Sequence, residues 1–309
     1  MDKLLWMRCF VRAVETGSFS AVARELGIGQ PNVSRHVAAL EKSLGTRLLH
    51  RSTRQMVATA EGKRYYAQAR QALDIIGEAE AQVHGEQDPH GLLRIACPES
   101  IGTELLIPAL PDFLQRYPHV DVECRLGDAY IDLVAEGIDI AIRGGKLRDS
   151  TLRARCVGQS ARICVASRTY LKQRGTPLEP GDLAAHDCIM YTLLAAGNDS
   201  WPFRDGDRKV SGRVRLNSLD GIRRAVLNDL GIAYLPACLD GDRGNAERRT
   251  GSVADRAWGA AGAVNVLYSA ERRLPRRAAV FVDFIAQVLA KVPGLNSTKV
   301  VPTRSACPK

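Results

Sequence analysis

The sequence predicts a multidomain protein with an all-α amino-terminal unit, a long connecting helix and a carboxy-terminal α/β domain. Apolar residues recur every three or four positions in the first part of the chain, and a long helix-favouring stretch follows. From Leu92 onward, short apolar runs alternate with helical patterns. With 309 residues, 45% of them hydrophobic and 25% charged, we expect two or three units with real cores. This composition excludes a disordered tail protein.

The positive charge is concentrated at the two ends of the chain. Residues 1–64 contain eleven basic and five acidic side chains, and the segment from Asn296 adds three basic ones. Residues 65–295 hold 29 of each sign and are neutral. The formal net charge of +9 therefore predicts a polyanionic partner for the amino-terminal unit in particular.

The cysteine pattern and the absence of long apolar segments indicate the cellular compartment of the protein. The eight cysteines form no CxxC pair and cluster with no histidines, which favours free thiols in a reducing cytosol over disulfides or a zinc site. Charged residues interrupt the start of the chain, and no uncharged apolar stretch reaches ~18 residues. We therefore expect a soluble cytoplasmic protein without a membrane partner.

Three helices are predicted in the first 45 residues. The first ends at Gly17 and presents one apolar face, Leu4, Met7, Val11 and Val14. Ser18 is a candidate N-cap for a short second helix, which ends at Gly27. After the turn Ile28–Gly29, the third helix faces the core with Val33, Val37, Leu40 and Leu44.

This order is typical of a helix-turn-helix, in which the amino end of the last helix enters the major groove of DNA. A three-helix module without a nucleic acid partner would show the same apolar spacing, but its exposed residues would mix Glu and Lys. The third helix instead begins with side chains suited to base edges and phosphates, after a proline that its first turn tolerates. The predicted DNA contacts are Gln30, Pro31, Asn32, Ser34, Arg35 and His36.

A short basic hairpin is expected after Gly45, from Arg47 to Val57. It would make the unit a winged helix-turn-helix, with Arg51 and Arg54 placed for phosphates or a neighbouring minor groove.

The segment from Phe10 to Gly62 resembles the winged helix-turn-helix of LysR-type transcriptional regulators. Its central sequence is FSAVARELGIGQPNVSRHVAALEKSLGTRLLHRSTRQMVATAEG, and the matching positions extend into the wing and beyond it. Gly29 stands where that family often has a Ser or Thr helix cap, Leu49 where it usually has Phe, and Ala58 where it usually has Leu. The resemblance implies a DNA-binding domain at residues 1–59.

A long helix is expected from Thr59, giving a linker at residues 60–88. Five of six residues along one seam are apolar or aromatic, namely Tyr66, Ala69, Leu73, Ile76 and Val83, with Glu80 as the exception. A helix packed only on its own domain is the alternative. In LysR-type proteins this helix pairs with its counterpart in a second subunit, so the resemblance implies a dimer. The residues Asp88–Gly91 would break the helix.

From Leu92 the order of strands and helices predicts a mainly parallel α/β sheet. Strands are expected at 93–97, 120–126, 138–142, 163–166, 189–191, 232–235 and 264–268. Helices are expected at 102–117, around 131–135 and from Pro275 to about Ala290.

This stretch resembles the LysR effector domain, a two-lobed fold like that of periplasmic binding proteins (type 2). The resemblance rests on P.S.G from Pro98, EG.D.AIR.G.L.DS.L.AR from Glu136, GIA.LP before Ala237, and Y...R.LP from Tyr268. It implies an effector-binding domain at 92–295, with lobe I at 92–161 and 269–292 and lobe II at 162–268. The loop Asp242–Arg256 is richer in Arg and Gly than is usual, and residues 296–309 are expected to be a disordered tail.

Two-lobed binders hold their ligand in the cleft, where helix amino termini present N–H groups to an anion. By resemblance, the effector-binding candidates are Ser100, Thr103, Gly127, Arg143 and Tyr191. Ser100 and Thr103 would alternatively be ordinary helix caps, and Arg143 would alternatively make a structural ion pair.

No catalytic motif is present: the sequence has no GxGxxG, P-loop, GxSxG or HExxH, and no two of its six histidines have the spacing of metal ligands. We therefore expect no enzyme, no cofactor and no metal. The favoured function is a LysR-type regulator that binds double-stranded DNA as a dimer or tetramer and responds to a small organic anion. The alternative is a small-molecule binding or transport protein with an incidental basic arm, which should have an export signal and no helix-turn-helix.

Overall fold

The computed structural model describes residues 2–51, 56–83, 88–145, 152–194, 199–239, 250–252, 258–259, 261–270 and 274–296. Contacts divide it into an amino-terminal unit, Met1–Asp88 with Asp132–Ile138, and a carboxy-terminal unit, Pro89–Ile131 with Asp139–Lys309. Of the sequence predictions, Arg54, most of the 242–256 loop and nearly all of the 296–309 tail lie outside the described residues. No helix in the described part is long and apolar enough to cross a membrane.

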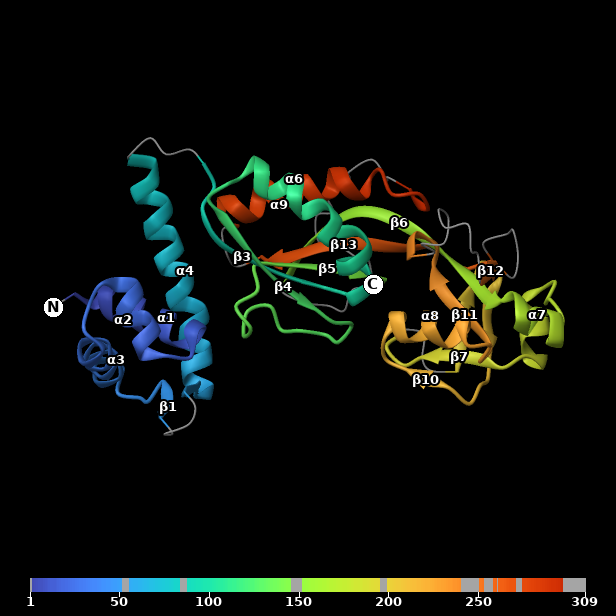
Figure 1. Ribbon diagram of the computed structural model, residues 1–309, viewed down its shortest axis with the longest axis horizontal. Helices are drawn as coiled ribbons and strands as arrows, with labels where there is room; N and C mark the ends of the chain where they lie inside the picture. The colour runs from blue at the N-terminus through green and yellow to red at the C-terminus, as the bar shows by residue number, and fades with distance from the viewer. Residues whose placement is uncertain are drawn as a thin grey trace, which may run out of the picture. The chain divides into compact units, whose positions relative to one another are not determined.

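Three helices and a hairpin form the amino-terminal unit, as predicted (Figure 1). The helices are α1 (Lys3–Thr16), α2 (Phe19–Leu26) and α3 (Gln30–Leu44). Each ends at a glycine with positive φ, and the Ser18 side chain caps α2 by accepting from the Ala21 amide. The strands β1 (Leu49–Arg51) and β2 (Met56–Ala58) pair antiparallel and form the wing.

The long helix α4 (Ala60–Val83) begins where the sequence predicted it, after Thr59. Its entry is fixed because the Thr59 hydroxyl donates to the Arg47 carbonyl and accepts from the Gly62 amide. A Cβ at Gly62 would lie 2.0 Å from the Leu48 carbonyl oxygen, so only glycine permits this approach.

The first half of the predicted α4 seam packs on its own unit. Tyr66 and Ala69 are buried in the core that α1, α2 and α3 form around Phe10, and Leu73 packs against it. Farther along, Ile75 is 50% and Val83 85% exposed. The first half of the seam therefore serves the unit's own core. Among the described side chains of α4, the exposed large hydrophobic ones are Ile75, which lies outside the predicted seam, and Val83, and both are in the carboxy-terminal half.

The carboxy-terminal unit is an α/β structure with a main sheet in the order β10-β7-β11-β6-β13-β5-β3-β4. Its first half contains β3 (Gly91–Cys97), β4 (Val120–Leu126), β5 (Ile140–Gly144) and β13 (Ala261–Ser269). Its second half contains β7 (Cys188–Tyr191), β10 (Arg215–Leu216) and β11 (Ile232–Pro236), and β6 (Leu152–Ser167) is shared. Two short strands, β12 (Thr250–Ser252) and β14 (Leu295–Asn296), pair with β6.

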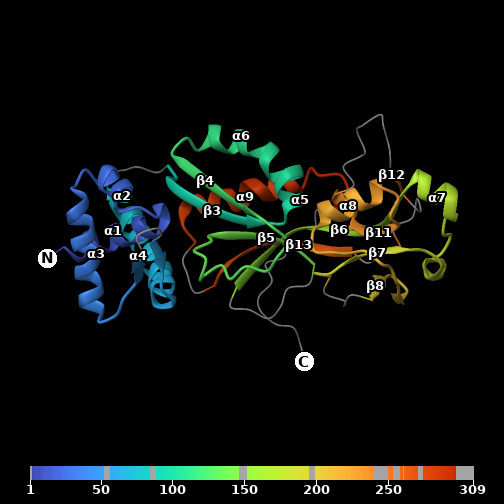
Figure 2. The same cartoon turned by 60° about the horizontal axis from the view of Figure 1, so that its bottom comes forward.

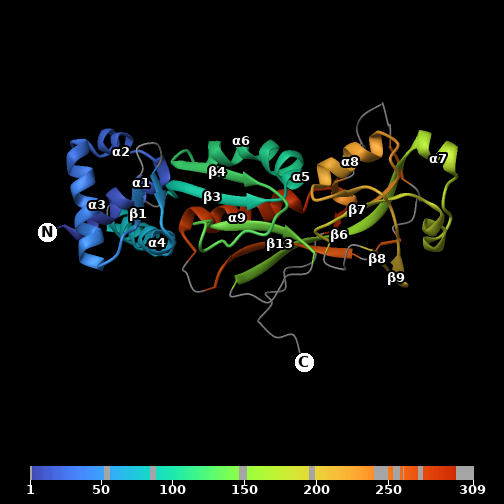
Figure 3. The ribbon, with the colours of Figure 1, turned by 90° about the horizontal axis from the view of Figure 1, so that it is seen from below.

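The sheet is mixed rather than mainly parallel. Parallel pairing joins β3 to β4 and β5, and β7 to β10 and β11, as the alternating pattern predicted. However, β6 is 16 residues long and pairs antiparallel with β13 and then with β11, so it links the two halves (Figures 1 and 3). The sequence showed only its last apolar run, 163–166.

Helices cover the first half of the sheet (Figure 2). The predicted 102–117 helix begins at Glu99 as α5 (Glu99–Ile101), continues as a π-helical segment (Gly102–Leu106) and ends as α6 (Ile107–Arg116). The last helix, α9 (Arg276–Leu289), packs beside it, with the Phe113 and Phe281 ring centroids 5.1 Å apart. These rings belong to the main core of the unit.

The predicted helix around 131–135 is wrong, because the segment forms turns. The Asp132 carboxylate accepts from the Val134 and Ala135 amides, which is an alternative to helical hydrogen bonding. Gly137 then adopts a φ of 65°, and this left-handed residue stops the chain from continuing as a helix.

The second half has elements that the sequence reading did not identify. They include α7 (Arg168–Arg174), α8 (Leu219–Leu227), short 3₁₀ turns at Pro180–Ala185 and Ala237–Leu239, and a hairpin of β8 (Ser200–Phe203) and β9 (Gly206–Lys209). Trp201 of the hairpin stacks on Tyr234 of β11, with ring centroids 5.2 Å apart. This contact attaches the hairpin to a separate small core.

Candidate nucleic-acid interface and ligand cavity

The amino end of α3 presents the predicted DNA-contacting side chains to solvent. Gln30, Pro31, Asn32 and Arg35 are exposed, while Ser34 and His36 are partly exposed. The core takes Val33, Val37 and Leu40 from the opposite side of the same helix. The first turn of α3 contains no acidic residue, and its cap, Gly29, has no side chain to occupy the first amides. The exposed face is therefore available to an anionic partner.

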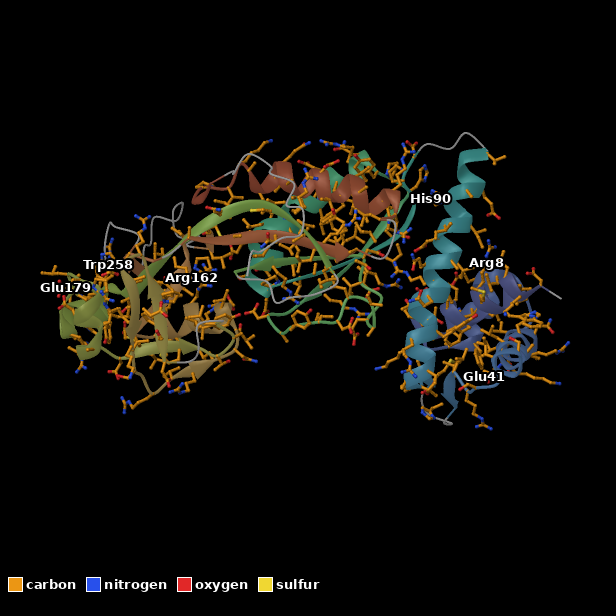
Figure 4. The ribbon with its side chains drawn as sticks, turned by 180° about the vertical axis from the view of Figure 1, so that it is seen from behind. Arg8, Glu41, His90, Arg162, Glu179 and Trp258 are labelled. Atoms are coloured by element: carbon orange, nitrogen blue, oxygen red, sulfur yellow. The ribbon has the colours of Figure 1, made fainter. Side chains whose placement is uncertain are left out.

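Acidic side chains of the same unit are held by internal partners. The Arg12 guanidinium binds the Glu25 carboxylate through two hydrogen bonds of 2.6 and 2.8 Å and also contacts Glu15. Glu41 accepts from the amides of Leu48 and Leu49 at the start of the wing (Figure 4). These bonds hold α1, α2 and the wing together. Arg12 compensates the charges of Glu15 and Glu25, and backbone amides satisfy Glu41.

The wing is described only in part. His50 is exposed, and the Arg51 backbone pairs with Met56 across the hairpin. The Arg51 side chain and the whole of Arg54 lie outside the described residues. Their predicted phosphate contacts therefore stay predictions.

A cavity of about 460 Å³ lies in the carboxy-terminal unit, between residues of both halves of the sheet. Its wall contains two arginines, Arg143 and Arg162, together with Asp128, Tyr191 and Cys238. Much of the remaining wall is apolar, including Pro98, Ile101, Leu193, Leu194, Leu219 and Val264. A concave, mostly apolar site with a few convergent polar groups is the usual form of a small-molecule site.

Arg143 is held in this wall by hydrogen bonds to backbone carbonyls. Its guanidinium donates to the carbonyls of Gly127, at 3.2 Å, and Ala129, at 2.8 Å, which flank Asp128. The Asp128 carboxylate accepts from the Glu99 amide, at 3.2 Å, and from the Leu219 amide at the start of α8, at 3.0 Å. Arg143 thus holds the loop that places Asp128 between the two halves of the unit.

Tyr191 lies beside both arginines and Asp128. Burial raises the pKa of the Tyr191 phenol, and the neighbouring Asp128 carboxylate, with which it forms a hydrogen bond, acts in the same direction. The phenol is therefore a neutral hydrogen-bond donor at physiological pH. Burial lowers the pKa of Arg143 and of Arg162, but a guanidinium remains protonated.

Three of the five predicted effector residues do not line this cavity. Ser100 is buried between two wall residues, Pro98 and Ile101, and its Oγ has no hydrogen-bond partner within the described structure. Thr103 is exposed, and its hydroxyl donates to the Glu99 carbonyl. Gly127 lies behind Asp128, where its amide donates to the Cys97 carbonyl. The structure brings together only Arg143 and Tyr191 of the predicted set.

Asp128 and Arg162 are wall residues that the sequence reading missed. Asp128 lies two residues after the end of β4, and polar residues at the carboxyl ends of parallel strands often face ligands, so that signal was present. Arg162 precedes the apolar run 163–166 and resembled a residue outside the strand. Its position inside β6 depends on pairing with Pro236 of β11, which no local pattern encodes.

Two family models match the chain. The model "Bacterial regulatory helix-turn-helix protein, lysR family" matches residues 4–63, and "LysR substrate binding domain" matches residues 86–290. Together they span the helix-turn-helix, the wing and the cavity-bearing unit.

Relatives and solved structures agree with these matches. The regulator CrgA of Neisseria meningitidis (serogroup C) is 33% identical over 284 residues, covering 91% of this chain and 95% of CrgA. The activator AaeR of Escherichia coli is 33% identical over 240 residues, covering 76% and 78%. A solved structure of N. meningitidis CrgA has a TM-score of 0.58 at 32% identity, covering 93% and 98%.

A full-length OxyR variant of Pseudomonas aeruginosa shares the fold, with a TM-score of 0.75 at 16% identity over 98% of both chains. The amino-terminal family model covers α3, and the carboxy-terminal one covers the residues that line the cavity. The chain belongs to the LysR family of transcriptional regulators, with a helix-turn-helix domain and an effector-binding domain.

Proposed function

We propose that this regulator binds a specific promoter or operator and that a small organic anion in the cavity modulates this binding. The observation that carries the proposal is the pair of guanidiniums, Arg143 and Arg162, in the wall of a mostly apolar cavity. Both guanidiniums are partly buried, and a partly buried cation attracts an anion more strongly than an exposed one because water screens it less. The buried Ser100 Oγ has no hydrogen-bond partner in the described structure, and this supports a ligand with a polar group near the same wall. Thr103 and Gly127 stay predictions as effector contacts.

At the DNA, we assign two kinds of contact. Gln30, Asn32 and Arg35 have the exposure and the chemistry to read base edges. Pro31, Ser34 and His36 belong to the same helical end, and Arg51 and Arg54 would contact phosphates from the wing. Sequence preference would therefore depend on α3, and general affinity would depend on the wing.

We also propose self-association, as a dimer or a tetramer, in the cytoplasm with the bacterial nucleoid. Two recognition helices in successive major grooves require a dimer. The exposed Ile75 and Val83 on the carboxy-terminal half of α4 supply apolar surface for pairing. For each subunit we propose the predicted domain organisation: a DNA-binding domain at 1–59, a linker helix at 60–88 and an effector-binding domain at 92–295. In the last of these, lobe I comprises 92–161 and 269–292, and lobe II comprises 162–268.

An electrophoretic mobility shift with DNA flanking the gene tests the DNA-binding proposal. The full chain should retard this fragment in preference to a scrambled fragment of equal length, and the affinity should fall as salt rises. Gln30→Ala should reduce the preference between the fragments, whereas Arg54→Ala should weaken both complexes. Equal retardation of both fragments at every salt concentration would contradict sequence-specific binding.

The effector part has its own measurement. Thermal unfolding of the full chain, screened against small organic acids and their neutral amides, should show stabilisation by one or more acids, because a ligand that binds only the native state raises its apparent stability. Arg168→Ala, which removes an exposed cation of α7 that does not line the cavity, is the control for a general charge effect. Stabilisation by the amides alone would refute an anionic effector.

A further inference from the structure

Arg162 has free hydrogen-bonding capacity in the cavity wall. Its guanidinium carbon lies 5.4 Å from the centre of the Tyr234 ring, and Nη1 makes one long bond of 3.5 Å to the Tyr234 carbonyl. No carboxylate in the described part of the chain forms an ion pair with it. A guanidinium has five N–H donors in a planar fork, so most of them remain for a ligand. Figure 4 labels Arg162 within the carboxy-terminal unit.

Arg143 differs from Arg162, although both are cations of the same wall. Two of its donors are bound to the carbonyls of Gly127 and Ala129. The Asp128 carboxylate, on the residue between those carbonyls, lies close enough to attract the Arg143 guanidinium. Removing these donors would release the loop that holds Asp128, so Arg143 is better suited to positioning the loop than to anchoring an anion.

The cavity also carries negative charge. The Asp128 carboxylate accepts two backbone amides, Glu99 and Leu219, and a second carboxylate, Asp207, belongs to the wall contributed by the β8–β9 hairpin. One anionic group at Arg162 would balance the uncompensated cation. A second anionic group on the same molecule would approach the partly buried Asp128 carboxylate, and like charges repel.

The body of the ligand would contact apolar side chains. The wall near Arg162 includes Leu194, Pro202, Pro236, Leu239 and Val264. The volume of about 460 Å³ is within the range of small-molecule sites and accommodates a ring or a short alkyl chain in addition to a carboxylate. Burying that body supplies affinity that a small polar anion lacks.

From these observations we propose that Arg162 is the anion-anchoring residue and that the cavity selects organic monoanions with an apolar body over dianions. Asp128 provides the discrimination by repelling a second negative charge on the ligand. This inference rests on the proposed function, in which the effector is an organic anion, and it specifies the class of that anion and the residue that binds it.

Matched series of small molecules test the proposal on the full chain. One series is benzoate, terephthalate and benzamide, which share a ring and differ in charge, and the other is valerate, glutarate and valeramide. The apparent Kd of each is measured from the shift in thermal unfolding over a concentration series. We expect one or both monoanions to bind. The matched amide should bind at least about tenfold more weakly, since it loses a charged hydrogen bond that contributes roughly that factor or more. The matched dianion should also bind at least about tenfold more weakly, because its second carboxylate approaches Asp128.

Three variants separate binding from folding. Arg162→Gln should weaken monoanion binding by about tenfold to a hundredfold, whereas Arg162→Lys, which keeps the charge, should retain part of it. Asp128→Asn should reduce the difference in apparent Kd between benzoate and terephthalate. The unfolding temperature without ligand is measured for each variant, and if Arg162→Gln does not fold, the comparison of Arg162→Lys and Asp128→Asn with the wild type still decides the matter.

The proposal is overturned if neither monoanion stabilises the wild type, if a dianion binds as tightly as its matched monoanion, or if Arg162→Gln and Arg162→Lys bind as the wild type does. The mobility shift is run on the same preparations without any ligand. Specific retardation together with dianion binding would leave the proposed function standing and refute this inference. Loss of specific retardation alone would refute the proposed DNA binding and leave the anion assignment intact.

Discussion

The two units differ in how their candidate functional residues are assembled. In the amino-terminal unit, the six candidates on α3 are neighbours in the sequence, and one helix presents them together. In the carboxy-terminal unit, Asp128, Arg143, Arg162 and Tyr191 come from separate strands and a loop, and they meet only because β6 joins the two halves of the sheet. A binding surface carried by one helix is readable from local pattern, whereas a cavity is a product of strand register.

The largest expected effect is in the amino-terminal unit, at the approach of α4 to the wing. Gly62→Ala places a Cβ against the Leu48 carbonyl, and we expect a loss of about 3 kcal/mol in the stability of that unit, measured by chemical denaturation. Specific DNA retardation should weaken with it. Gly77→Ala is the control, since that site is open and helical, and it should gain roughly 1 kcal/mol. Equal effects of the two substitutions would show that the close approach is not required.

The next largest effect is a change in DNA affinity without a change in stability. Arg35→Ala should lower the affinity for the preferred DNA by about tenfold, because a good base contact contributes roughly 1–3 kcal/mol, and it should leave the unfolding temperature unchanged. Arg168→Ala removes an exposed charge from the other unit and should leave DNA affinity almost unaffected. A titration by fluorescence anisotropy measures both, and equal losses would mean that net charge alone governs binding.

A matched pair of helix caps compares the two units directly. The Ser18 hydroxyl accepts from the Ala21 amide at the start of α2, and the Ser218 hydroxyl accepts from the Gly221 amide at the start of α8. Each substitution by Ala should cost about 1 kcal/mol, and the double variant should lose the sum, because the sites belong to separate cores. Urea denaturation measures these losses in stability, with Ser20→Ala, at an exposed serine of α2, as the control. A double variant whose loss differs strongly from the sum of the two single losses would show that the units are coupled.

The smallest effect is a pH dependence confined to the carboxy-terminal unit. Burial lowers the pKa of His186, and the positive charge of Arg174 acts in the same direction, while Asp182 and Asp187 oppose it. The unfolded state therefore binds a proton first as the pH falls below about 6.5, so stability conferred by neutral His186 is present above that pH and is lost as the pH falls through the lowered native pKa. Denaturation between pH 8 and pH 5 should give a shallower pH dependence for His186→Asn. An unchanged slope would rule out this contribution.

Much of the fold was predictable because its signals are local. Gly17 and Gly27 end helices at positive φ, and Ser18 caps the next one, as their residue types suggested. The apolar runs of β3, β4 and β11 matched observed strands. The helix expected around 131–135 was wrong because one carboxylate, Asp132, competes for the amides that a helix would use. The β8–β9 hairpin was missed because Trp201 and Phe203 stabilise it through contacts with distant Tyr234.

The sequence by itself determined which residues begin and end the amino-terminal helices, which face of α3 is polar, and where the basic charge lies, because these properties depend on neighbours a few positions away. It also identified Arg143 and Tyr191 as candidates. Only the tertiary structure decided that Arg143 is bound to the Asp128 loop and that Arg162 stands without a carboxylate partner among the described residues. The reason is that both outcomes depend on the register of β6 against β11 and β13, over separations of about seventy to a hundred residues.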